Sequence, residues 1–553
     1  MSRTLFTSAG LALCAAAMPA AAQVGDAAPV ADAPPATVSG PPARRTYVAP
    51  YVEAAQILDA DLNSGDVLTY SSIAVGVDAG IDTARASGQI SYRYERRIGW
   101  DDEIGDDDVH SGLARGSVRL TRGLSVDAGA LAARSRSDIG GAAPGNFVGN
   151  VDNVSQIYSV YAGPSLSTQA GPLAIIASYQ AGYTKVETPT FDASGSTPRR
   201  LDYYDDSVGH VVAASVGTAP NTVLPVGVTA SAAYVRETAG QLSQRFEGGY
   251  GRLDVLAPVS PTVAIAAGVG YEKIETSQKD ALVDATGVPV LDRDGRFRTD
   301  PASPRRVAYR TDGVYYDAGV VWRPNRRTEL RAAFGKRYGS ESLTGTATWQ
   351  ASPNAGVAIG IYDTVTTFGR QLRTGLSNLP TSFRTQRDPF AQQFGGCVFG
   401  TAGATPGGCF DDVFQSISTA SYRARGIEGV ASATRGRSSY GAGAGYSNRR
   451  LHAPFNGSGI VTSGQEDESV YGQLFYGYSL TAVSGLDLNG FVNYYDSEVP
   501  GSDEVYSGGA TATYYHGFGR LSATAATGLY AFKVGDFDTQ WSAQALLGAR
   551  YTF

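Results

Sequence analysis

Five arginines are the first candidates for a functional role, because each lies in a segment where polar and apolar residues alternate. They are Arg93, Arg115, Arg119, Arg331 and Arg550. A guanidinium group carries a permanent positive charge and donates several hydrogen bonds. A series of such groups along a water-filled path would favour anionic solutes.

Other polar residues hold equivalent positions in neighbouring segments. The neutral ones would bind sugars by hydrogen bonding and ring stacking, and they are Tyr315, Tyr471, Gln473, Asn489, Asn493 and Tyr495. The remaining charged ones are Arg337, Glu95, Asp127, Asp317 and Glu329. Because opposite charges on adjacent strands pair with each other, a solvated wall with balanced charges is the alternative to a selective path. The residues alone leave both interpretations open.

The cysteines predict a disulfide. Cys14 lies within an N-terminal export signal, so cleavage of that signal would leave Cys397 and Cys409 as a pair. An exported chain meets an oxidising compartment, where such a pair normally bridges. The Gly-rich segment 400–408 between them can close the loop. A metal site would need further cysteine or histidine ligands nearby, which the sequence does not supply.

The segment 369–420 is too long for a simple connection, which indicates a functional loop. It contains Arg370, Arg373, Arg384 and Arg387, together with Phe383, Phe390, Phe394, Phe399, Phe410 and Phe414. So many aromatic side chains would be a liability in water. We expect the loop either to fold inward and narrow a pore, with the disulfide stiffening its tip, or to form a cap packed on neighbouring surface loops.

Two further patterns favour no catalytic or metal chemistry. The acidic run from Asp101 to Asp108 lacks the spacing of a twelve-residue calcium loop, and a solvated acidic loop is the simpler interpretation. Cations bridging this run to lipopolysaccharide are the alternative. The histidines, at positions 110, 210, 452 and 516, belong to no nucleophile motif. We therefore expect no enzyme activity and no cofactor.

The elements that position these residues are β-strands. In the stretch 89–95, Ile90, Tyr92 and Tyr94 alternate with polar residues, and successive strand side chains point to opposite faces. Segments of about ten residues with this pattern, separated by turns, are typical of a transmembrane β-barrel. The chain closes on such a segment, ending with Tyr551 and Phe553, a terminus that serves the barrel-assembly machinery as a recognition signal.

Composition excludes other classes of protein. The 553 residues include 68 Gly, 32 Tyr and 20 Phe, which is too aromatic for a disordered chain and too Gly-rich for an ordinary helical enzyme. No apolar run beyond the N-terminus approaches the roughly 20 residues of a membrane helix. The net charge of -7 argues against binding to nucleic acid.

The sequence divides into three parts. Residues 1–22 have the features of a signal peptide: Arg3, an apolar core from Leu5 to Met18, and small residues before Gln23. Residues 23–45 are rich in Pro and Ala and predict a disordered periplasmic segment. Residues 46–553 predict one large antiparallel barrel, which makes the protein all-β.

The alternating segments number about 22. Weak hairpins near Gly240 and Ser340 would reduce the number to 20 or 18 if they were absent. Short turns are expected on the periplasmic side and long loops outside. A barrel of this size cannot fill its lumen with wall side chains, and 23–45 is too short for a folded plug domain, so the candidate plug is a loop.

The stretches Arg45–Glu53 and Gly548–Phe553 resemble those of a plugless outer-membrane porin-like family of Gram-negative bacteria, the alphaproteobacteria in particular. Members of such families are sometimes labelled as preprotein translocase subunit YajC. A YajC-like protein is a short chain with one membrane helix, and the sequence does not support that label. The resemblance covers most of the mature chain and implies a barrel without an N-terminal plug domain.

Three functions fit this barrel. The first is a passive or weakly selective pore for small hydrophilic solutes, either anionic or saccharide. The alternatives are a structural or adhesive surface barrel acting through its extracellular loops, and an exopolysaccharide-export barrel. In each case the protein would lie in the cell outer membrane, with lipid, lipopolysaccharide and the assembly machinery as partners.

Overall fold

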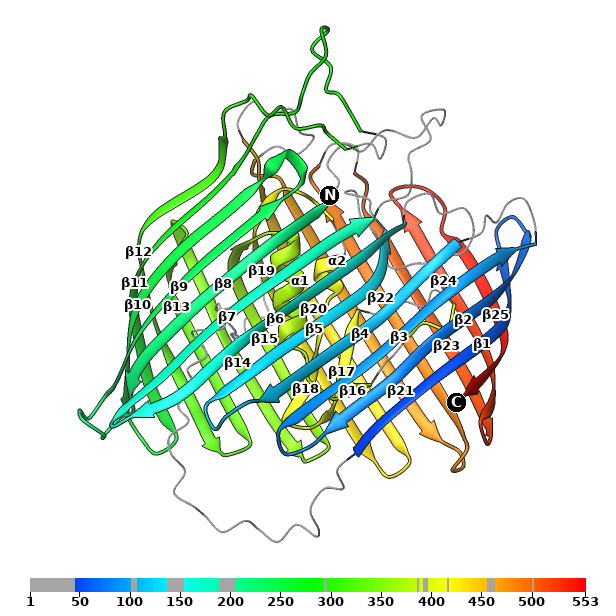
Figure 1. Ribbon diagram of the computed structural model, residues 1–553, viewed down its shortest axis with the longest axis horizontal. Helices are drawn as coiled ribbons and strands as arrows, with labels where there is room; N and C mark the ends of the chain where they lie inside the picture. The colour runs from blue at the N-terminus through cyan, green and yellow to red at the C-terminus, as the bar shows by residue number, and fades with distance from the viewer. Residues whose placement is uncertain are drawn as a thin grey trace.

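The chain forms one 22-stranded antiparallel barrel (Figure 1). The computed structural model describes residues 45–100, 107–136, 154–187, 204–292, 296–384, 387–390, 396–414, 417–454, 463–499 and 502–553. The predicted signal peptide, nearly all of the predicted periplasmic segment, most of the acidic run and Phe394 lie outside these residues.

The wall strands run in sequence order around the ring. They are β1 (Arg45–Asp61), β2 (Val67–Asp82), β3 (Ala86–Gly99), β4 (Asp107–Arg119), β5 (Leu124–Arg136), β6 (Val154–Ala170), β7 (Leu173–Glu187), β8 (Asp206–Thr218), β9 (Gly227–Ala239), β10 (Arg245–Pro258), β11 (Val263–Gln278), β12 (Arg306–Asn325), β13 (Thr328–Arg337), β14 (Ser340–Ser352), β15 (Ala355–Thr366), β19 (Ser421–Arg435), β20 (Ser438–His452), β21 (Glu466–Ser479), β22 (Ser484–Ser497), β23 (Val505–Phe518), β24 (Leu521–Val534) and β25 (Gln540–Thr552).

The ring closes between the first and last wall strands, where Tyr51 pairs with Thr552 and Asp61 with Ser542. The prediction of about 22 strands is confirmed. Both uncertain hairpins are present: β9 pairs with β10, across the short helix η1 (Gln241–Ser243), and β13 pairs with β14. A closed ring gives the wall strands a neighbour on each side, which is what a sheet in lipid requires.

The expected alternation is visible along β3. Ile90 and Tyr92 are 47% and 37% exposed on the outer face, whereas Ser91 and Arg93 are buried on the lumen face. Across the barrel, the exposed large side chains are mostly Val, Ile, Leu, Tyr and Trp, which form an apolar outer surface. This outer surface and the closed ring identify an outer-membrane β-barrel. Among the described residues, no helix is long and apolar enough to cross a bilayer.

Short turns gather at one end of the barrel and long connections at the other (Figure 1). The short-turn end includes the links 83–85, 171–172, 436–437 and 519–520, together with Phe553 and the start of β1. In barrels of this class, short turns face the periplasm. The short-turn end of this barrel is therefore its periplasmic end.

The connection between β15 and β19 runs inside the barrel rather than over its mouth (Figure 1). We call residues 367–420 the internal plug. It contains α1 (Phe368–Asn378), β16 (Phe383–Arg384), β17 (Cys397–Ala402), β18 (Thr405–Cys409) and α2 (Asp411–Phe414). Strands β16, β17 and β18 form a separate three-stranded sheet. Of the two arrangements expected for this loop, the structure has the inward one.

Candidate functional site: the plugged lumen

The internal plug lies against an apolar patch of the inner wall. Leu113, Leu131, Ile157 and Val186 come from β4, β5, β6 and β7, point inward, and are at most 4% exposed. They form one cluster with apolar side chains of the plug. A lumen filled only with water would not favour this patch, because burying each such side chain contributes about 1.5–3 kcal/mol relative to leaving it exposed.

Helix α1 supplies the matching surface. Phe368, Leu372 and Leu376 recur at four-residue spacing on one face, and each is fully buried. The helix begins directly after β15, where the Thr367 side chain caps it by accepting a hydrogen bond from the Arg370 backbone amide at 3.3 Å. The apolar face of α1 therefore docks on the wall, and its other face is left towards the lumen.

A buried ion pair fixes α1 in place. The Arg373 guanidinium is 2.7 Å from a Glu237 carboxylate oxygen on β9, and both side chains are at most 6% exposed. The same guanidinium donates to the hydroxyls of Thr184 and Ser207 at 3.1 Å. A buried cation needs such partners, because desolvation costs several kcal/mol per ion.

Wall arginines also hold the plug by its backbone. Arg97 donates to the Phe390 carbonyl at 2.7 Å, and Arg115 donates to the Ser377 carbonyl at 2.6 Å. In the opposite direction, Arg387 of the plug donates to the Ser91 hydroxyl at 2.8 Å. Burial lowers the pKa of the Arg387 guanidinium from its ordinary value. These contacts anchor the plug to β3 and β4.

Other parts of the plug contact the remaining wall. Phe390 packs with Ile57, Tyr70 and Tyr530 of β1, β2 and β24. Phe399 packs with Phe475 of β21, with ring centroids 6.3 Å apart. Towards the periplasmic end, the Gly403 backbone amide donates to the Pro353 carbonyl at 2.8 Å. The plug therefore extends across the lumen and reaches the short-turn end.

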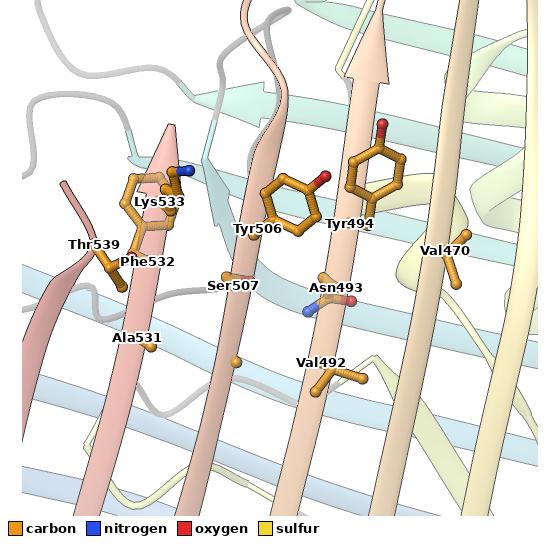
Figure 2. Close-up of a pocket in the computed structure, with 11 residues that line it drawn as sticks. Val470, Val492, Asn493, Tyr494, Tyr506, Ser507, Ala531, Phe532, Lys533 and Thr539 are labelled. Atoms are coloured by element: carbon orange, nitrogen blue, oxygen red, sulfur yellow. The ribbon is translucent and has the colours of Figure 1, made fainter. Parts of the chain in front are cut away.

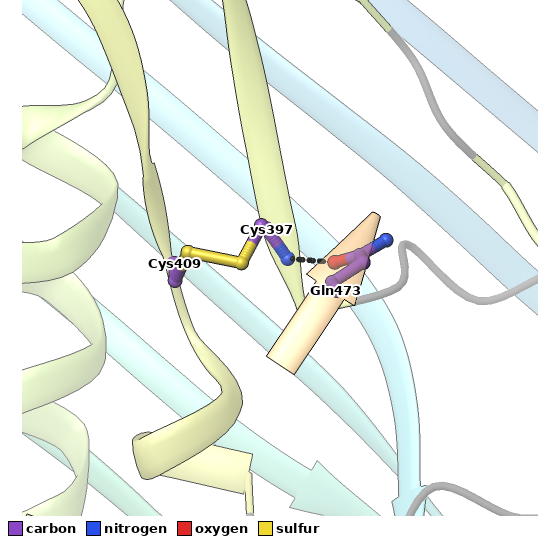
Figure 3. Close-up of a disulfide and its surroundings, with 3 residues drawn as sticks. All are labelled: Cys397, Cys409 and Gln473. Atoms are coloured by element: carbon purple, nitrogen blue, oxygen red, sulfur yellow. Dashed lines mark hydrogen bonds between the residues drawn. A yellow bond between two sulfur atoms is a disulfide. The ribbon is translucent and has the colours of Figure 1, made fainter. Parts of the chain in front are cut away.

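A disulfide joins β17 to β18 inside the plug, between Cys397 and Cys409 (Figure 3). The Cys397 backbone amide donates to the Gln473 side-chain oxygen on β21 at 2.9 Å. Gly443 of β20 gives the bridge room, because a Cβ there would lie 2.4 Å from the Cys397 sulfur. The bridge therefore packs directly against the wall.

Most of the sequence-predicted arginines form ion pairs along the lumen face. Arg93 contacts Glu53 at 2.8 Å and Glu95 at 2.6 Å. The other three pairs are Arg550 with Asp78 at 2.6 Å, Arg331 with Glu329, and Arg115 with Asp127 at 3.8 Å. Arg119 is exposed near the periplasmic end of β4. The wall is thus charge-balanced at four of the five positions.

These arginines do not form one cluster. Arg550 lies over the Tyr51 ring, with its guanidinium carbon 3.4 Å from the ring centroid. Arg115 contacts the plug instead, and Arg331 lies on β13 in another part of the ring. The five arginines therefore do not form a continuous series of unpaired positive charges along the lumen.

A cavity of about 420 Å³ remains beside the plug. One side of it is the polar face of α1, with Gln371, Thr374 and Asn378. The other sides come from the walls, including Tyr161 of β6, Tyr362 of β15 and Glu428 of β19. Because it lies between α1 and wall strands far apart in sequence, this cavity is the candidate site.

A second hollow, of about 360 Å³, lies on the outer face of the barrel (Figure 2). Its lining includes Val492 and Tyr506, which are 64% and 45% exposed, and the side chain of Lys533. The rings of Tyr494 and Tyr506 lie 4.9 Å apart between their centroids. This hollow faces lipid and belongs to the outer surface rather than to the solute path.

The final aromatic residues lie at the periplasmic end of β25. The Tyr551 and Phe553 rings meet edge to face with centroids 5.2 Å apart, and they are 37% and 62% exposed. They are therefore accessible at the end of the strand that closes the ring.

Sequence reasoning missed the partners of the plug. The sequence pattern does not identify Glu237, Leu113 or Tyr161 as site residues, and it predicts no helix within 369–420. One signal could have found the docking patch: Leu131 and Ile157 are apolar at positions that the alternation assigns to the lumen. Apolar residues on a lumen face indicate that another part of the protein, rather than water, covers them.

The comparisons with known proteins bear on the fold alone. No family model matches the sequence, and a search of curated proteins finds no match. Solved structures with a similar barrel include the siderophore receptor PirA from Acinetobacter baumannii, at 10% identity and a TM-score of 0.38, covering 92% of this chain and 81% of that one. The ferric-catecholate import receptor Fiu from E. coli K12 has 9% identity and a TM-score of 0.42, covering 91% and 81%. The alcaligin receptor FauA from Bordetella pertussis has 12% identity and a TM-score of 0.37, covering 93% and 77%. At these values, the ligands of those receptors have no bearing on this chain.

Proposed function

We propose that the protein is an outer-membrane channel in which small hydrophilic solutes pass along a narrow path beside the internal plug. The observation that carries this proposal is the polar cavity between α1 and the wall. A structural barrel would gain nothing from an amphipathic helix whose polar face lines an open space. A wide passive pore would gain nothing from a segment anchored across its lumen.

Selectivity by charge is expected to be weak. Arg93, Arg115, Arg331 and Arg550 each lie near a carboxylate, so their fields are largely cancelled. Together with Arg119, they remain candidates for selectivity residues. A salt gradient across the membrane tests this expectation, because the sign of the reversal potential reports the favoured ion.

The test of the channel is planar-bilayer conductance of the refolded mature chain. The comparison variant replaces residues 369–418 with a short Gly-Ser linker. The control variant shortens the connection 279–305, which projects away from the barrel (Figure 1). We expect small steady conductance from the wild type and the control, and several-fold larger conductance from the plug-deleted variant, because a 22-stranded lumen is too wide to fill itself.

Two outcomes would contradict the channel. Equal conductance with and without the plug would show that the plug does not constrict the path. No conductance from either folded variant would favour the adhesive or polysaccharide-export alternative. Folding is checked independently by the shift in gel mobility on heating.

We infer that residues 1–22 direct export, that residues 23–45 remain in the periplasm, and that the barrel-assembly machinery recognises Tyr551 and Phe553. Lipid and lipopolysaccharide are the expected surroundings of the outer face, whose hollow beside Lys533 is open to them.

A further inference from the structure

Two buried polar atoms at the cavity have no partner of their own. The Tyr161 hydroxyl and the Arg115 Nε have no hydrogen-bond partner among the described residues. Tyr161 is 4% exposed and Arg115 is 9% exposed, and both line the cavity. A buried polar group without a partner costs about 1–3 kcal/mol. The site is therefore arranged to receive a molecule that accepts hydrogen bonds.

The charges at this site decide which molecule fits. Arg115 Nη1 lies 3.8 Å from an Asp127 carboxylate oxygen, and Asp127 lines the same cavity. A carboxylate only accepts hydrogen bonds, and it repels an anion placed beside it. The ligand must therefore donate to Asp127 while accepting from Arg115 and Tyr161. An anion that carries no hydrogen-bond donor, such as sulfate, cannot do both.

The rest of the lining is balanced in charge and mixed in its hydrogen bonding. Arg370 of α1 and Glu428 of β19 add one charge of each sign, so with Arg115 and Asp127 the charges of the lining cancel. Gln371, Thr374 and Asn378 of α1 carry amide or hydroxyl groups, which both donate and accept. Tyr161 and Tyr362 bring aromatic rings from different parts of the wall. The cavity volume of about 420 Å³ falls within the range of roughly 300–1,000 Å³ found for small-molecule sites.

We propose that this cavity binds a neutral saccharide, whose hydroxyls donate to Asp127 and accept from Tyr161 and Arg115. A sugar hydroxyl is both donor and acceptor, so one molecule satisfies all three groups. The inference deepens the proposed channel by naming its solute class, and it rests on that function for its biological meaning. Binding itself does not depend on conduction.

Calorimetric titration of the detergent-solubilised full barrel tests the site. The probes are glucose, sucrose and raffinose as neutral sugars, and phosphate and citrate as anions. We expect at least one sugar to bind with measurable heat, and the anions to bind much more weakly. In Tyr161→Phe, which removes only the hydroxyl, sugar affinity should fall roughly fivefold to tenfold.

A second variant and a control keep the test specific. Asp127→Asn retains the shape but removes the negative charge, so sugar binding should weaken while phosphate binding improves. The control is Tyr70→Phe, a buried lumen tyrosine on β2 whose hydroxyl also has no partner among the described residues and which does not line the cavity. It should bind sugar as the wild type does, and each variant is first checked for folding by heat-dependent gel mobility.

The results separate the site from the channel. Sugar binding by a barrel that conducts nothing would support the site and overturn the proposed channel. Conductance without sugar binding, or anion binding tighter than sugar binding, would overturn the saccharide site and leave the channel in place. Equal sugar affinity in the wild type and in Tyr161→Phe would also overturn it.

Discussion

Replacing Glu237 with Gln should release the internal plug. The substitution keeps the size of the side chain but removes the carboxylate that lies 2.7 Å from the Arg373 guanidinium. Arg373 could still donate to the Gln amide oxygen and to the hydroxyls of Thr184 and Ser207, but its buried positive charge would lose this counter-charge. Breaking a buried ion pair by removing one member costs about 3–5 kcal/mol.

That cost falls on the docked state of the plug rather than on the barrel. Glu237 pairs with Phe246 through the backbone ladder of β9 and β10, and the substitution leaves this ladder intact. Because 1.4 kcal/mol is a factor of ten in an equilibrium constant, the ratio of undocked to docked plug should rise at least about a hundredfold. Single-channel recording measures this ratio as the fraction of time spent in large openings.

A matched control is Glu329→Gln. Glu329 is also a lumen carboxylate, paired with Arg323 at 3.0 Å and with Arg331, but its side chain is about one-third exposed. Since exposed pairs contribute little, this variant should gate like the wild type. If Glu237→Gln opens no more often than Glu329→Gln, then the buried pair does not hold the plug, and the reasoning from burial is wrong.

Three further predictions concern the plug hairpin and the end of the chain. The double variant Cys397→Ser with Cys409→Ser should leave the barrel folded but make its current noisier, and an unchanged single-channel record would argue against a role for the bridge in stiffening the plug. Gly443→Val should displace the β17–β18 hairpin, because even the Cβ of the new side chain would lie 2.4 Å from the Cys397 sulfur. Protease cleavage between β16 and β17 should therefore be faster than in the wild type, and equal cleavage rates would contradict this. Deleting Phe553 should reduce the amount of heat-modifiable barrel in the outer membrane several-fold without changing refolding of the purified chain in detergent; if refolding fell equally, the residue would serve stability rather than assembly.

The barrel could be predicted because its rule is local. A strand between lipid and lumen must alternate apolar and polar side chains. The pattern is visible within a few residues, because Ile90 and Tyr92 face outward whereas Arg93 faces the lumen. The hairpin turns follow from the same pattern. Even the weak hairpin near Ser340 is present, because Arg337 and Ser340 are ladder partners across a two-residue turn.

The plug could not be predicted in the same way. Its contacts join residues far apart in sequence, such as Arg373 with Glu237 and Arg115 with Ser377. Alternation identifies a lumen face but does not say whether water or protein covers it. The cavity depends on both the wall and the docked helix, so Tyr161 acquires its role only when α1 is in place.

Both ends of the internal plug continue directly into wall strands, β15 on one side and β19 on the other. The internal plug is therefore present at a fixed effective concentration relative to the lumen, and dilution of the protein does not lower it. A plug that undocks stays tethered close to its docking surface on the inner wall. Its return is therefore an intramolecular step whose rate is independent of protein concentration. A lasting open state would then require a molecule that competes with the plug for its docking surface on the wall. The extent of opening would be set by the local concentration of that competitor.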